Sequence, residues 1–276
     1  LSRTTPVLTN LKPVGQYQME DLYYAGGIPA VLKQLLPLLN GDTLTVTGKT
    51  LAENVAHAEV INPDIIRSLD APLKPEGGLS VLRGSLAPDG AGIKHAAASP
   101  ALMQHRGRAI VFKDMDDLRA RIHSDDLDVT KDDILVLQNV GPVGGPGMPE
   151  VVNLPIPRKR LKQGIRDMVR ISDGRMSGTS YGTIVLHVAP ESAIGGTLAL
   201  VQTGDEIELD VENRRLHLHV SDAELAKRRA EWQPPQTAFT RGYGQMFLQH
   251  VNQAPLGCDF DFLRGNDPVE VTKQPK

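Results

Sequence analysis

The 276-residue sequence contains a single cysteine, Cys258, so no disulfide can form within the chain. One thiol also cannot supply the several ligands that a zinc site or an iron–sulfur cluster requires. Cysteine-poor sequences are typical of a reducing compartment, and we therefore expect a cytoplasmic protein. Cys258 itself is interpreted as a small buried hydrophobic residue.

The sequence also lacks a surplus of positive charge, since 30 Lys and Arg residues stand against 33 Asp and Glu residues. This balance favours neither a nucleic-acid partner nor an anionic membrane surface. No apolar run approaches the ~18–20 residues of a membrane span, so we expect no membrane partner. The chain begins at Leu1 without the charged-then-apolar pattern of a signal peptide, and we expect it to be a fragment of a longer chain.

Hydrophobic periodicity predicts the elements. The pattern over 18–36 is helical, but Gly26, Gly27 and Pro29 interrupt it and predict two short helices. Short apolar stretches over 77–95 predict strands joined by tight turns. Further strands are expected over 42–48, 108–114, 132–140, 183–190 and 198–220, and further helices over 49–58, 115–124, 221–232 and 240–254. Ser221, with Glu224 three residues later, is the predicted N-cap of the helix over 221–232. The sequence thus predicts a mixed α/β domain rich in strands behind a helical lead-in.

Two glycine-rich stretches follow apolar segments. The first, GPVGGPGMPE over 141–150, is not a dinucleotide-binding fingerprint, because its prolines prevent a helix from opening there. Its glycines would let the backbone approach a ligand closely, and Glu150 is a candidate ligand for a hard cation such as Mg²⁺. From the residues alone, an ordinary surface loop is the favoured interpretation.

The second stretch, SDGRMSG over 172–178, places Ser177 on a turn that Asp173 and Gly174 favour. A serine hydroxyl needs a neighbouring base or cation to become a base or nucleophile itself, and no histidine lies nearby in sequence. From composition alone, a turn whose hydroxyls bond the local backbone is favoured. His187, in the apolar strand expected over 183–190, is interpreted as a hydrogen-bonded core histidine.

Taken together, the motifs resemble one family. GGIPAVLKQLL, TLTVTGKTLAENV, LRGSLAPDGAGIKHAA, GPGMPE, SDGRMSG and HVAPESAIGG occur in this order, followed by the stretch over 204–232. They resemble the C-terminal half of the iron–sulfur-dependent dehydratases that include dihydroxy-acid dehydratase and phosphogluconate dehydratase. The stretch RGYGQMFLQHVNQAPLGCDFDFLRG is most similar to the sugar-acid branch, such as arabinonate and xylonate dehydratases.

The resemblance implies a reaction and roles for three residues. The family removes water from a 2,3-dihydroxy acid to give a 2-keto acid, using Mg²⁺ and a [2Fe–2S] cluster that acts as a Lewis acid. It implies that Ser177, as an alkoxide, is the catalytic base and that Glu150 is a magnesium ligand. It further implies that Thr179 helps to bind the substrate. Two bound cations beside one hydroxyl would favour its deprotonated form.

The resemblance also implies a domain organisation. We expect residues 1–40 to end a missing N-terminal cluster-binding domain, 41–265 to form a swivelling β/β/α domain like the mobile domain of aconitase, and 266–276 to be a flexible tail. The cluster cysteines and further magnesium ligands would lie in the missing domain, so this chain alone is expected to be inactive. A homodimer or homotetramer is expected. Two alternatives stay open: a dihydroxy-acid dehydratase of branched-chain amino-acid synthesis, and a non-catalytic swivel or dimerisation module.

Overall fold

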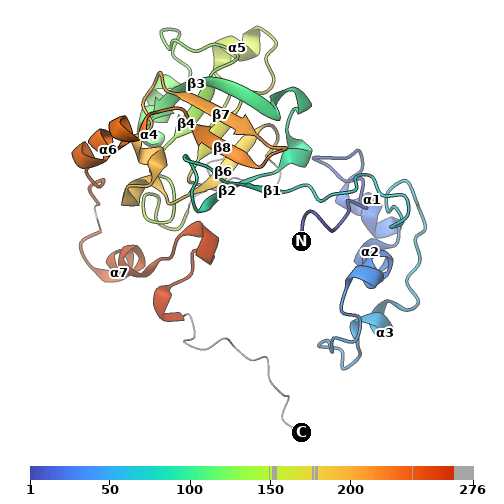
Figure 1. Ribbon diagram of the computed structural model, residues 1–276. Helices are drawn as coiled ribbons and strands as arrows, with labels where there is room; N and C mark the ends of the chain where they lie inside the picture. Colours follow the sequence, from blue (N-terminus) through green and yellow to red (C-terminus); the bar gives the residue numbers. More distant parts are fainter. Residues whose placement is uncertain (149, 151–153, 176, 178–179, 238, 264–276) are drawn as a thin grey trace. The chain divides into compact units, whose positions relative to one another are not determined.

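The computed structural model describes residues 1–148, 150, 154–175, 177, 180–237 and 239–263 (Figure 1). The chain divides into two compact units. The first comprises residues 1–79 and 95–97, and the second comprises residues 80–94 and 98–276. The helical lead-in expected over 1–40 falls inside the first unit. Within the part of the chain that the structure describes, no helix is both long and apolar enough to cross a membrane.

The first unit is built from short helices. They are α1 (Met19–Tyr24), α2 (Gly27–Leu35), η1 (Leu36–Leu38), α3 (Leu51–Val55) and η2 (His95–Ala97). The predicted interruption between the first two helices is confirmed, because Gly26 has a φ of 121° between α1 and α2. A small apolar core holds the unit together, formed by Leu22, Ala25, Ala30, Ile65 and Ile66.

The strand predicted over 42–48 is wrong. These residues form turns with one isolated bridge between Leu44 and Thr50, and Val46 is fully exposed. The hydroxyl of Thr45 donates to the Lys49 carbonyl at 2.9 Å, so local bonds replace a sheet ladder. The helix predicted to follow is confirmed in a shorter form. Thr50 caps α3 by accepting from the Glu53 amide, and the Glu53 carboxylate accepts from the Thr50 amide.

The second unit is a mixed eight-stranded sheet. Its strands run in the order β1-β2-β6-β5-β4-β3-β7-β8. Strands β3, β4, β5 and β6 are parallel to their neighbours within this group, and the remaining pairs are antiparallel. The bounds are β1 Ser80–Leu82, β2 Gly90–Ile93, β3 Gln104–Phe112, β4 Ile134–Leu137, β5 Arg170–Ser172, β6 Ile184–Ala189, β7 Glu206–Asp210 and β8 Arg215–Leu218.

The two ends of this sheet meet, so it is nearly a closed barrel. Arg83, directly after β1, forms a parallel bridge with Arg215 of β8. The Arg83 amide donates to the Arg214 carbonyl at 2.8 Å, and the Leu216 amide donates to the Arg83 carbonyl at 2.9 Å. Gly84 makes this approach possible, because a Cβ there would lie 2.1 Å from the Leu216 carbonyl oxygen.

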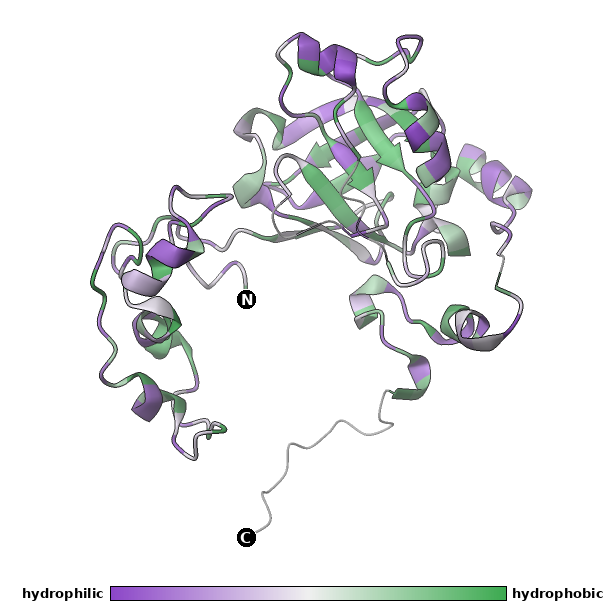
Figure 2. Cartoon of the chain, turned by 180° about the vertical axis from the view of Figure 1, so that it is seen from behind, coloured by the Kyte–Doolittle hydropathy of each residue, from purple (hydrophilic) through white to green (hydrophobic). Residues whose placement is uncertain are grey.

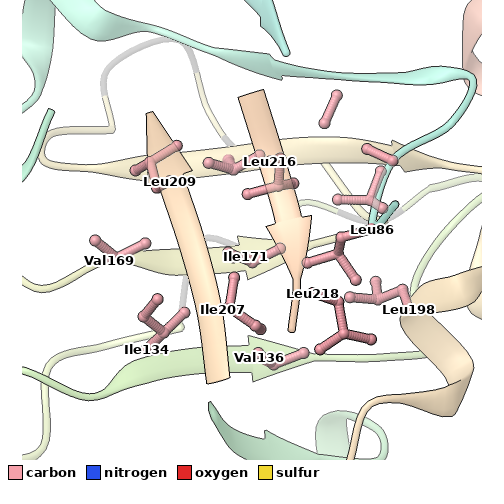
Figure 3. Packing of buried hydrophobic residues seen from close by; sticks show 14 of the residues in the cluster. Leu86, Ile134, Val136, Val169, Ile171, Leu198, Ile207, Leu209, Leu216 and Leu218 are labelled. Carbon is pink, nitrogen blue, oxygen red and sulfur yellow. The ribbon is translucent and has the colours of Figure 1, made fainter. Parts of the chain in front are cut away.

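Apolar side chains fill both faces of the sheet. Figure 3 shows leucines, isoleucines and valines from β4, β5, β7 and β8 meeting inside the barrel, among them Val136, Ile171, Ile207 and Leu216. A second cluster includes Phe112 and Leu118 and packs outside the parallel strands. Figure 2 shows apolar colouring along the central strands of the sheet, as buried parallel strands require.

The described residues of the second unit also form the α-helices α4 (Met115–Arg121), α5 (Arg158–Lys162), α6 (Asp222–Glu231) and α7 (Gly242–His250). The short 3₁₀ turns are η3 (Pro100–Leu102), η4 (Ser192–Ile194), η5 (Thr197–Leu200), η6 (Ala254–Leu256) and η7 (Asp261–Leu263). The predicted N-cap of α6 is confirmed, since Ser221 accepts from the Glu224 amide. The strand predicted from residue 198 is wrong at its start, which is η5. The mixed, strand-rich α/β class is confirmed.

Candidate functional site

The candidate site lies where three neighbouring parallel strands end. Strands β4, β5 and β6 lie side by side in the sheet. The glycine-rich loop follows β4, the SDGRMSG turn follows β5, and Pro190 and Glu191 follow β6. The carboxyl ends of parallel strands are where open α/β sheets bind ligands. The two motifs singled out in the sequence are therefore neighbours at one edge of the sheet.

The carboxylate of Asp173 joins the three loops. It accepts hydrogen bonds from the Val140 amide at 3.0 Å and from the Ser192 amide at 2.8 Å. Asp173 is completely buried, and burial raises the pKa of its carboxyl although both amides favour the ionised form. This residue was predicted to be only a turn former, but it ties the turn to the segments that follow both neighbouring strands.

A second buried carboxylate, Glu191, holds the glycine-rich loop. It accepts from the amides of Val143 and Gly144 at 2.9 Å each and from the side-chain amide of Gln253. The Glu191 backbone amide in turn donates to the side-chain oxygen Oε1 of Gln253 at 2.9 Å. Burial raises the pKa of Glu191, and the charge of Asp173 adds to the increase. A Cβ at Gly141 would lie 2.6 Å from this carboxylate, so the loop needs glycine there.

Arg175 connects the two motif loops directly. Its guanidinium donates to the Glu150 carboxylate at 3.2 Å and, through Nε, to the Met148 carbonyl at 2.9 Å. Glu150 and Arg175 also form an isolated parallel bridge. Glu150 is exposed, and Ser177, two residues after Arg175, is half-buried. Thr179 lies outside the described residues.

The described residues do not form a metal site by themselves. No group of three or more His, Cys, Asp or Glu side chains that could hold a metal ion occurs among them. The exposed carboxylate of Glu150 fits the role of one ligand to a hard cation, which often takes only one or two protein carboxylates. Cys258 is half-buried rather than buried, and its Sγ lies 3.1 Å from the Met148 Sδ. One thiol in such a contact does not fit an iron–sulfur cluster.

The interpretation of His187 as a hydrogen-bonded core histidine is wrong. Its ring is only half-buried, and the enclosed Nδ1 has no hydrogen-bond partner. Its backbone has a φ of 54°, which strains a residue within a strand, and its amide donates to the Gly174 carbonyl at 3.1 Å. Burial lowers the pKa of His187, and the positive charge of Arg175 lowers it further, so the ring is neutral at pH 7.

Sequence reasoning missed the supporting residues of the site. Glu191 and Gln253 lie 62 residues apart, and no spacing rule indicates that they pair. A usable signal did exist for Glu191, because it stands directly after the Ala-Pro that ends a predicted apolar strand. Sequence reasoning gave Arg175 no role in the site.

Comparison with known proteins places the chain among dehydratases. The profile described as dihydroxy-acid/6-phosphogluconate dehydratase C-terminal matches residues 64–258, and its N-terminal counterpart matches residues 1–54. The chain is 54 % identical over 265 residues to a protein named L-arabinonate dehydratase from Rhizobium leguminosarum bv. trifolii, covering 95 % of this chain and 46 % of that protein.

An L-arabonate dehydratase from Azospirillum brasilense is 50 % identical over 282 residues, with 98 % of this chain and 48 % of that protein covered. A dihydroxy-acid dehydratase from Acetivibrio thermocellus is 41 % identical over 262 residues, with 94 % and 46 % covered. The chain thus spans about half the length of the curated relatives it matches. These matches show that the chain belongs to the dihydroxy-acid/6-phosphogluconate dehydratase family.

Proposed function

We propose that this chain is the C-terminal part of a sugar-acid dehydratase, a hydro-lyase that converts an aldonate to a 2-keto-3-deoxy acid. The observation that carries the reaction is the ion pair between Glu150 and Arg175, because it joins the two family motifs at one edge of the sheet. The substrate class is supported by identity. Relatives named for arabinonate are 50–54 % identical, whereas those named dihydroxy-acid dehydratase are 41–44 % identical.

In the proposed reaction, the Ser177 oxygen takes the proton from carbon 2 of the substrate. The electron pair of that C–H bond forms the double bond between carbons 2 and 3 as the hydroxyl leaves carbon 3. The proton and the departing hydroxide make up the water that is lost, and the enol then tautomerises to the 2-keto acid. Arg175 lies two residues from Ser177, and its positive charge favours an anionic oxygen nearby.

Glu150 is proposed to bind Mg²⁺, and Thr179 to bind the substrate. When bound, the cation supplies positive charge for the substrate carboxylate and the developing enolate. Asp173 and Glu191 fix the loops that carry these residues, so that the base and the metal ligand keep a constant separation. Ligands for a [2Fe–2S] cluster are proposed to lie outside this chain, in an N-terminal cluster-binding domain against which this unit swivels.

The proposal is tested in the full-length enzyme with Ser177→Ala and, as a matched control in the same turn, Ser180→Ala. We expect Ser177→Ala to lower kcat by about 10²–10⁴-fold, the usual contribution of a positioned base, and Ser180→Ala to leave it nearly unchanged. Normal turnover by Ser177→Ala would refute the base assignment. An unchanged Mg²⁺ requirement in Glu150→Gln would refute the metal assignment.

The same assay separates the alternatives. An enzyme that dehydrates a branched-chain 2,3-dihydroxy acid in preference to aldonates belongs to amino-acid synthesis instead. A full-length protein that binds its metals yet dehydrates neither class would be a non-catalytic module.

A further inference from the structure

A cavity of about 500 Å³ lies beside the candidate site, within the second unit. Its size falls in the ~300–1,000 Å³ range of small-molecule pockets. One wall is formed by β1, β2 and the turn between them, with Val81, Arg83 and Asp89. A second wall is formed by 254–258, and His187 of β6 also lines the cavity.

Three contacts place this cavity next to the proposed base and metal ligand. The His187 amide bonds to Gly174, three residues before Ser177. Cys258 of the cavity wall contacts Met148, two residues before Glu150. Arg175 bonds to Met148 and lies near enough to His187 to lower its pKa. The cavity is therefore lined by residues that contact both motif loops.

The wall at 254–258 is held in place by the same carboxylate that holds the glycine-rich loop. Gln253, directly before this wall, exchanges two hydrogen bonds with Glu191, at 2.9 and 2.6 Å. Glu191 accepts from Val143 and Gly144 as well. A fixed wall of this kind can discriminate among ligands by their size and polarity.

Most of the lining is apolar, but three polar side chains in it, Arg83, Asp89 and His187, suit hydroxyl groups. Arg83 offers hydrogen-bond donors and Asp89 offers acceptors. Their charges have opposite sign and balance each other, so the cavity favours a neutral ligand over an anionic one. A neutral histidine ring carries one proton, on Nδ1 or on Nε2. Because Nδ1 is enclosed without a partner, the tautomer with the proton on Nε2 avoids burying an N–H donor that has no acceptor. No described residue hydrogen-bonds to this ring. Its Nε2–H is a donor for a ligand.

We propose that this cavity binds the hydroxylated carbons beyond carbon 3 of an unphosphorylated sugar acid, with His187 as a binding residue. The inference rests on the proposed function, since that function supplies a substrate with such a chain. It also gives a physical reason for preferring sugar acids. A branched-chain dihydroxy acid ends in alkyl groups, which would leave the polar groups of the cavity without partners.

The test compares two ligands in the full-length enzyme: arabinonate, which has the additional hydroxylated carbons, and glycerate, which has only the three reacting carbons. The readouts are the KM for arabinonate and the inhibition constant of glycerate. His187→Asn removes the ring and keeps a residue that tolerates positive φ. Val81→Phe narrows the cavity from the β1 wall, and because Val81 is exposed the larger side chain should not destabilise the fold. Leu161→Phe adds the same ring on α5, outside the cavity.

We expect His187→Asn and Val81→Phe each to raise the KM for arabinonate about tenfold, the equivalent of about one hydrogen bond or one lost contact. The glycerate constant should stay within about twofold, and Leu161→Phe should change neither value. If both constants rise together, or neither changes, the cavity is not the subsite and the proposed function still stands. If the wild-type enzyme dehydrates no sugar acid, the proposed function fails and this inference fails with it.

Discussion

The carboxylate of Asp173, directly after β5, accepts a hydrogen bond at 2.8 Å from the backbone amide of Ser192, which follows β6. Its other oxygen accepts from the Val140 amide after β4. One buried side chain therefore satisfies backbone donors that follow both neighbouring strands. Backbone amides buried without acceptors are costly, so the closeness of the three loops depends on this residue.

Asp173→Asn tests that dependence. Asparagine has nearly the same shape, but its NH₂ group would face an amide donor in place of an acceptor. We expect a loss of about 1–3 kcal/mol in the free energy of unfolding, the cost of a buried unsatisfied group. Urea unfolding followed by the fluorescence of Trp232, the single tryptophan, measures it. The exposed Asp116→Asn is the control, and equal midpoints for both variants would contradict the assignment.

Glu191→Gln tests the raised pKa of that carboxyl. A pKa above the ordinary 4.5 means that the folded state binds the proton more tightly than the unfolded state. The stability contributed by this linkage is present below pH ~4.5 and is lost as the pH rises through the raised value. Glutamine has no such proton, so the stability advantage of wild type over the variant should shrink from pH 4 to pH 8. Unfolding curves at several pH values measure this advantage, and a constant difference would contradict the shift.

Arg170→Met tests the buried ion pair beneath the site. Arg170 donates to Asp167 at 3.2 Å, and both side chains are almost entirely enclosed. Burial opposes ionisation of Asp167, but bonds from Thr183 and Ser99 and the charge of Arg170 outweigh it and lower its pKa. Removing the arginine leaves Asp167 as an unpaired buried charge and should lower the free energy of unfolding by about 3–5 kcal/mol.

The control for that experiment is Arg119→Met, which breaks a pair with Asp116 at the same sequence spacing but on the exposed surface. Surface pairs contribute little, so its midpoint should stay close to that of wild type. The lowered pKa of Asp167 stabilises the folded state at pH values above the pKa that this carboxyl has in the unfolded chain, and this contribution is lost at lower pH. The loss of unfolding free energy in Arg170→Met should therefore become smaller near pH 3. A deficit that grows on acidification would be inconsistent with this account.

Gly144→Ala tests the close packing of the glycine-rich loop. A Cβ at this position would lie 2.7 Å from the Asn139 carbonyl carbon, so the backbone must shift. We expect a loss of about 1–3 kcal/mol, as for other overpacked sites. In Gly92→Ala the new Cβ would meet nothing nearer than the Leu186 oxygen at 4.0 Å, and we expect little change or slight stabilisation. Urea midpoints compare the two, and a larger loss in Gly92→Ala would oppose the argument.

Much of the fold could be predicted from local patterns. Strands with strong apolar periodicity, such as β3 and β4, and caps such as Ser221 depend on nearby residues and were located correctly. The strand predicted over 42–48 failed because its alternating pattern has no neighbouring strand to pair with, and strand propensity reflects packing against neighbours. β5 has only three residues and was not predicted as a strand at all.

The two motifs of the candidate site could be predicted from the sequence, but the buried carboxylates that fix their loops could not. Ser177 and Glu150 were found because their motifs resemble a family, and their roles stay predictions. The contacts of Asp173 and Glu191 could not be found, because they join amides 19 to 48 residues away in sequence. A carboxylate that serves as a turn former and one that fixes three loops have the same local sequence, and only the tertiary fold separates them.

The bridge between Arg83 and Arg215 has a consequence for the solubility of the domain. An open sheet presents rows of unpaired amides and carbonyls that can recruit strands from other molecules and seed aggregates. Here some of the edge amides and carbonyls next to β1 and in β8 are hydrogen-bonded to each other. Variants that break this junction, more than variants of the helices around it, are the ones in which we expect fibre formation or intermolecular strand exchange.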